Sequence, residues 1–199
     1  MEYGKYIGRA YDIACQHGFH DRDLPLGHWQ MLVITEVSEL VEADRKQMRA
    51  RRGMFEKFNS PEYQQVIKEN ILNQEREVRC CTFSFCFESF IKDTVEDEMA
   101  DVCIRLFDIA GTFGFKIDDV RSGTINENIV KQFRSKLPTE IARELCYLLS
   151  SGSFGKVTVE MALLFMETWA KALGIDLEWH IAMKMQYNDE RPRMHGKKY

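Results

Sequence analysis

Helix-breaking residues are scarce in this chain, and their scarcity is the feature that most constrains its fold. The 199 residues include only four prolines, which stand far apart, and no glycine occurs between Gly53 and Gly111. Sandwiches and barrels need turn residues at intervals of about 8–12 residues. The two-residue alternation typical of half-buried strands is nowhere sustained. The sequence therefore predicts an all-α fold.

The spacing of apolar residues predicts five to seven helices in one domain covering residues 1–199, built as a helical bundle with a four-helix core. Gly18, Gly111 and Gly174 are expected to end helices, and Asp176 to cap the last one. Two segments differ in composition from the helical runs: 46–80 is predicted to be a charged insertion or arm, and 190–199 a basic C-terminal tail. The helical runs are expected at 3–17, 28–50, 82–110, 138–149, 157–173 and from Asp176 to about Glu190.

Charge and cysteine content limit the possible partners. The formal net charge is −4, which gives no general attraction to nucleic acid or to an anionic membrane. No apolar run reaches the roughly 18 residues of a membrane-spanning helix, and the N-terminus is too polar for a secretory signal. None of the six cysteines forms a CxxC pair. We therefore expect a cytoplasmic protein with reduced thiols and no nucleic-acid or membrane partner.

Two predicted helices each carry a pair of acidic residues three positions apart. Glu36 and Glu39 lie in the run 28–50, and Glu98 and Asp101 lie in the run 82–110. At about 100° per residue, both pairs fall inside the apolar stripe of their helix. Burying an unpaired carboxylate costs several kcal/mol, so a cation is expected among these acids.

A hard divalent ion is the cation that suits these ligands best. Oxygen-only ligands on helices favour Mg²⁺, with Mn²⁺ also possible, whereas a di-iron bundle would show Glu-x-x-His pairs. The alternative is that the acids face solvent or pair with arginine and lysine. Arg105 shares the face of the second pair and is a candidate partner, whereas Lys92 falls about 120° away and is expected to be exposed.

These motifs resemble those of the MazG-type all-α nucleoside triphosphate pyrophosphohydrolases. The resemblance covers about 28–45, 90–111 and 180–199, with the contexts EVSELVEA, EDEMADVCIRL and KMQYNDERPRMHGKKY. The family pattern is EExxE followed by ExxD. Thr35 stands here at its first glutamate, and residues 46–95 lengthen the spacer.

The resemblance implies a MazG-like fold, self-association as a homodimer or dimer of dimers, and hydrolysis of a nucleoside triphosphate to the monophosphate and pyrophosphate. It assigns both catalysis and Mg²⁺ binding to Glu36, Glu39, Glu98 and Asp101, with Glu36 the first candidate base. The C-terminal residues would bind the phosphates, sugar or base of the substrate. These residues are Lys184, Tyr187, Asn188, Arg191, His195, Lys197 and Lys198.

Other interpretations of the same features stay open. The acids could be structural clusters in a non-enzymatic helical oligomeric interaction module, or serve a phosphohydrolase that releases single phosphates. The basic tail could be a solvated end. The aromatic run 83–90 and the tryptophans read as core or subunit interface, and a metal site made by His17, His20 and His28 is a minor alternative.

Overall fold

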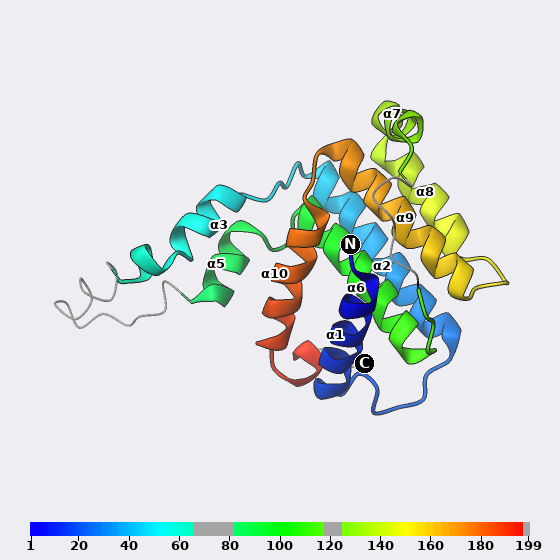
Figure 1. Cartoon of the computed structure of the whole chain (residues 1–199), viewed down its shortest axis with the longest axis horizontal. Helices are drawn as coiled ribbons and strands as arrows, with labels where there is room; N and C mark the ends of the chain where they lie inside the picture. Colours follow the sequence, from blue (N-terminus) through cyan, green and yellow to red (C-terminus); the bar gives the residue numbers. More distant parts are fainter. Residues whose placement is uncertain (66–81, 118–124, 197–199) are drawn as a thin grey trace.

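The structure of the chain is a computed structural model that describes residues 1–65, 82–117 and 125–196, with side chains as far as residue 194. Every regular element within these ranges is a helix (Figure 1), so the all-α prediction is confirmed. In this part of the chain, no helix combines the length and the hydropathy needed to cross a membrane.

Helix α6 (Val95–Thr112) lies at the centre of the described structure. It contacts α1 (Tyr3–Gln16), α2 (Leu26–Arg45), α9 (Lys156–Leu173) and α10 (Leu177–Asp189). Thirteen of its eighteen residues are buried, so neighbouring helices cover most of its circumference. Four acids on α6, Glu96, Asp97, Glu98 and Asp108, are consequently buried, and each needs a partner or a ligand.

The remaining helices form two groups on either side of this centre. On one side, α7 (Glu127–Ser135) and α8 (Pro138–Leu149) pack on α9, and α8 also packs on α2. On the other, α3 (Arg52–Phe58) and α5 (Phe83–Phe90) project beside α10 (Figure 1).

These two projecting helices have an apolar cluster of their own. Phe55 and Phe87 are buried in this cluster, and Tyr187 of α10 packs in it, which joins the two helices to α10. The predicted charged arm at 46–80 is thus partly helical as far as the structure describes it, and its remainder from residue 66 lies outside the described residues.

Several predicted helix ends are confirmed. The first helix ends at Gln16, and Gly18 follows with φ +80°. Gly174 caps α9 in the left-handed conformation, and the side chain of Asp176 accepts a hydrogen bond from the Trp179 amide at 3.2 Å. Glycine tolerates the left-handed conformation that follows a helix, and aspartate accepts a hydrogen bond from a free amide of the first turn.

The prediction of one continuous helix over 82–110 is wrong. The chain breaks between α5 and α6, where Asp93 has φ +60°. Thr94 then caps α6: its hydroxyl accepts from the Asp97 amide and donates to the Ile91 carbonyl at 2.6 Å. The local threonine cap outweighs a helical periodicity that runs through the break.

The predicted helix over 28–50 also ends early, at Arg45, because the following backbone bonds to α6 instead. Val95 donates to the Met48 carbonyl at 3.0 Å, and the Ala50 amide donates to Glu96 Oε2 at 2.9 Å. Gln47 turns the chain with φ +56°.

Gly111 serves packing rather than the helix stop that we predicted. Helix α6 continues to Thr112, and Gly114 takes the left-handed position with φ +64°. A Cβ on Gly111 would lie 2.6 Å from the Cβ of Tyr11, so a glycine is needed here for α1 to approach α6.

Candidate active site

A cavity of about 280 Å³ lies among α1, α2, α6 and α10, and all four predicted acids line it. Glu36 and Glu39 enter from α2, and Glu98 and Asp101 from α6. The three-residue spacing puts both members of each pair on one side of their helix, and the α2–α6 contact brings the two sides together.

Three of these acids form a close group. Glu36, Glu98 and Asp101 each place a carboxylate oxygen within 4.8 Å of the others. Glu36 and Glu98 are buried, and Asp101 is half-buried. Glu39 lines the same cavity but is exposed and lies outside this group. The two motifs therefore meet at one cavity, but Glu39, which was expected on the buried stripe with Glu36, is exposed.

Protein cations sit among these acids, as the cost of burying carboxylates predicts. Arg105 donates from Nε to Glu36 Oε1 at 3.0 Å, which confirms the expected partnership. Lys184 Nζ lies 2.7 Å from Asp101 Oδ2 and 2.9 Å from Asp97 Oδ2. Burial alone would lower the pKa of Lys184, but the two aspartates raise it well above its usual value. Lys184 therefore stays charged.

Glu98 lies among these groups without a comparable partner. Its side chain is buried, and its Oε2 has no hydrogen-bond partner. Burial, followed by the charges of Asp101 and Asp97, raises the pKa of Glu98 to about 9. Without an added cation, Glu98 is therefore largely protonated at neutral pH.

The break before α6 changes the surroundings of the site. Lys92 lies outside α6, so its predicted position 120° from the acids does not apply. Its side chain lines the cavity, is 34% exposed, and bonds Asp93 at 2.8 Å. The expectation of a simply exposed Lys92 is thus wrong.

Three acids near the start of α6, Asp93, Glu96 and Asp97, were missed by the sequence analysis. Asp97 is buried beside Glu98, with its Oδ1 unpartnered, and forms a second close oxygen group with Asp93 and Glu98. The run of three acids at 96–98 was a usable signal, because three consecutive acids on a buried helix cannot all face solvent. Glu96, the first of the three, accepts from Arg49 at 2.9 Å.

The structure places some of the predicted substrate-binding residues of the tail at the cavity and others away from it. Lys184, Asn188 and Arg191 line the cavity, and Asn188 has a buried, unpartnered Oδ1. Tyr187 instead stacks on Phe87, with ring centroids 4.6 Å apart, and donates its hydroxyl to Glu88 at 2.7 Å. Its ring face is therefore already packed in the apolar cluster of α3 and α5.

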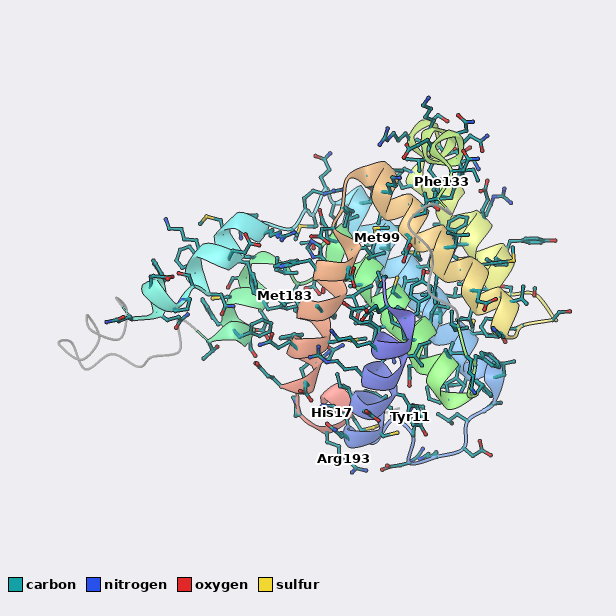
Figure 2. All side chains as sticks on the ribbon, in the orientation of Figure 1. Tyr11, His17, Met99, Phe133, Met183 and Arg193 are labelled. Atoms are coloured by element: carbon teal, nitrogen blue, oxygen red, sulfur yellow. The ribbon has the colours of Figure 1, made fainter. Side chains whose placement is uncertain are left out.

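The end of the chain returns to α1. Figure 2 labels Arg193 and His17 side by side, at the end of α1 where η2 (Arg193–Gly196) lies. The Met194 amide donates to the His17 carbonyl at 2.9 Å, and Arg193 pairs with Asp21. The side chain of His195, as well as Lys197 and Lys198, lies outside the described part of the chain.

The histidines near α1 do not form a metal group within the described residues. His20 Nε2 instead bonds Asp108 Oδ1 at 2.7 Å. Asp108 and Phe19 also line the cavity, and neither was singled out by the sequence analysis.

Comparisons with protein-family models, curated proteins and solved structures find no match to this chain. The chemistry of the cavity is therefore the basis for assigning a function.

Proposed function

We propose that the protein hydrolyses a nucleoside triphosphate to the nucleoside monophosphate and pyrophosphate in an Mg²⁺-dependent reaction, with Mn²⁺ as a possible substitute. The observation that carries this proposal is the group of Glu36, Glu98 and Asp101 oxygens within 4.8 Å of one another in a cavity that Arg191 and Lys92 also line. Carboxylates and basic groups meeting in one cavity fit a metal-assisted reaction on phosphates.

The donor set fits a hard divalent cation. All three residues offer oxygen, which Mg²⁺ and Mn²⁺ prefer. Glu98 Oε2 is a buried acceptor without a partner, and a nearby cation would remove both that deficit and the repulsion from Asp101. Glu39 lies at the exposed side of the cavity and would complete the set.

Bound Mg²⁺ would supply positive charge against the triphosphate oxygens and favour deprotonation of the attacking water. The protein's own groups hold this arrangement. Arg105 fixes Glu36 through Oε1, which leaves the second oxygen of this first candidate base to accept a proton from water. Lys184 holds Asp101 through the 2.7 Å contact between its Nζ and Asp101 Oδ2.

The basic groups at the cavity bind the substrate in this proposal. Arg191 and Lys92 contact phosphate oxygens, and Arg191 can do so bidentately. Asn188, whose Oδ1 is unpartnered, accepts a hydrogen bond from the sugar or base. We assign Lys184 the role of positioning Asp97 and Asp101 rather than of binding substrate, because its ammonium group is already paired with both carboxylates.

The resemblance to MazG-type enzymes agrees with this chemistry. We extend the proposal to a MazG-like four-helix core made by α1, α2, α6 and α10, to assembly as a homodimer or dimer of dimers, and to a cytoplasmic location.

A panel of canonical and modified nucleoside triphosphates tests the activity. With Mg²⁺, pyrophosphate and monophosphate should appear for at least one nucleotide and should disappear for Glu98→Gln. The matched control is Glu42→Gln, at a half-buried acid on α2 that pairs with Arg45 and does not line the cavity, and this variant should keep full activity. Release of single phosphates would instead identify a phosphohydrolase, and no turnover by a protein that binds Mg²⁺ would end the catalytic proposal.

A non-enzymatic interaction module is the second candidate. It is favoured by the neutralisation of Glu36 by Arg105 and of Asp101 by Lys184 within the chain, because structural acid clusters are paired in this way. A ligand that binds only the folded state must raise thermal stability. A thermal midpoint that does not respond to Mg²⁺ or Mn²⁺ would favour the module.

A further inference from the structure

We call the part of the cavity lined by α1 and by the α6 residues after Asp101 its second end; it combines apolar residues with Arg105, whose guanidinium carbon lies 5.9 Å from the centroid of the Phe19 ring. Ala10, Ile13 and Ala14 face it from α1, Phe19 from the following loop, and Ile104 from α6. Phosphates and metal ions gain nothing from its apolar residues, whereas a flat and weakly polar ring gains by leaving water. This end therefore suits a part of the ligand that differs from the triphosphate.

One acidic residue, Asp108, lines this end of the cavity beside Arg105. Asp108 is 3% exposed and lines the cavity, two helical turns after Asp101. At 1.5 Å per residue, the two are separated by about 10.5 Å along α6. That separation is the length scale of a nucleoside between its 5′ oxygen and the outer edge of its base.

Asp108 is held in place by His20, which is not one of the residues that line the cavity. Nε2 of His20 lies 2.7 Å from its Oδ1, and because an ionised carboxylate has no hydrogen to donate, the imidazole is the donor. The His20 ring is stacked on Trp29, with ring centroids 4.9 Å apart, and is tilted against Tyr11, which is labelled on α1 in Figure 2, with centroids 5.0 Å apart. An ionised carboxylate offers about four lone-pair positions, and His20 uses one of them.

We propose that this end binds the base of the nucleoside triphosphate, and that Asp108 selects bases that carry an exocyclic amino group. Phe19 and the apolar residues of α1 contact the faces of the base, and the Asp108 carboxylate accepts hydrogen bonds from its edge. The inference rests on the proposed function, since it requires the triphosphate to lie at the acid group.

The selection follows from donor and acceptor patterns. Adenine, guanine and cytosine each present amino hydrogens that a carboxylate can accept. Uracil and thymine flank their ring N–H with two carbonyl oxygens, which a buried carboxylate would repel. His20 acts as a positioning residue, because it holds the carboxylate in the orientation that meets the base.

Equilibrium binding of non-hydrolysable nucleotides tests the proposal without depending on turnover. The probes are the α,β-imido analogues of dATP, dGTP, dCTP, dTTP and dUTP, titrated calorimetrically with Mg²⁺ present. The wild-type protein should bind the three amino-bearing analogues at least about tenfold more tightly than the other two. Asp108→Asn, which gains a donor, should reduce this ratio to about one or reverse it.

Control variants separate recognition from general damage. Asp23→Asn, an exposed acid in the same loop, should keep the wild-type ratio. Phe19→Ala should weaken all five analogues while keeping the ratio. His20→Gln retains a donor for Asp108 and should preserve much of the ratio, whereas His20→Ala should lose it.

The possible failures are distinguishable. Equal binding of all five analogues by the wild-type protein, or an unchanged ratio in a folded Asp108→Asn protein, would overturn the base selection and leave the proposed hydrolysis standing. Absence of binding by every analogue would overturn the proposed function and this inference with it.

Discussion

Replacing Glu98 with glutamine should stabilise the metal-free protein at neutral pH. Burial and the neighbouring aspartates raise the pKa of Glu98 to about 9 in the folded protein, from 4.5 for a free side chain. A raised carboxyl pKa means that the folded state binds the proton more tightly than the unfolded state. Its contribution to stability is complete below about pH 4.5 and is lost as the pH rises toward 9.

The size of the effect follows from that shift. One pKa unit corresponds to about 1.4 kcal/mol, and pH 7.5 lies about three units above the free value of 4.5. The free energy of unfolding of the wild-type protein is therefore lower than that of Glu98→Gln by at most ~4 kcal/mol at about pH 7.5. The cavity admits water, which screens the charge, and we therefore expect about half of this bound, ~2 kcal/mol. For a chain of this length, that difference raises the thermal midpoint by about 4–8 °C.

Thermal unfolding followed by circular dichroism in EDTA measures the effect. Glu98→Gln should melt above the wild-type protein at about pH 7.5, and the difference should shrink to near zero at about pH 4.5. Glu42→Gln should stay within about 0.5 kcal/mol of wild type at both pH values. A Glu98→Gln protein that melts at or below the wild-type temperature at neutral pH would refute the account of an uncompensated buried carboxylate.

Three further changes test the packing around the site by chemical denaturation. Gly111→Ala should cost about 1–3 kcal/mol because of the contact with Tyr11, whereas Gly8→Ala, with open space around it, should not destabilise. Lys184→Met should cost about 3–5 kcal/mol at neutral pH, since it leaves two carboxylates without their cation. Thr94→Ala should cost about 0.5–2 kcal/mol through loss of the α6 cap. If the free energy of unfolding falls by less than about 0.3 kcal/mol in Gly111→Ala, Lys184→Met or Thr94→Ala, the role assigned to the contact at that residue is wrong.

The helical architecture was predictable because helix ends depend on nearby residues. The glycine after α1, the glycine cap of α9 and the Asp176 cap all act within one turn of the backbone. The break before α6 was missed for the complementary reason. Apolar spacing continues through residues 91–94, and only the hydrogen bonds of Thr94 and the unusual backbone of Asp93 show that the helix restarts there.

Part of the candidate site was also accessible to helical geometry. Acids three residues apart on apolar stripes were expected to meet around a cation, and Arg105 was correctly placed on their face. Partners that come from other elements were not predictable in this way. The pairing of Lys184 with Asp97, and that of His20 with Asp108, join residues 87 and 88 positions apart. Such contacts depend on how the helices pack, which periodicity does not specify.

Phosphorus NMR of a nucleoside triphosphate incubated with the protein and Mg²⁺ tests the central claim most directly. For at least one member of the nucleotide panel, the account predicts that the triphosphate signals give way to those of the monophosphate and pyrophosphate. Inorganic phosphate with a diphosphate, or unchanged spectra for every nucleotide tested, would contradict it.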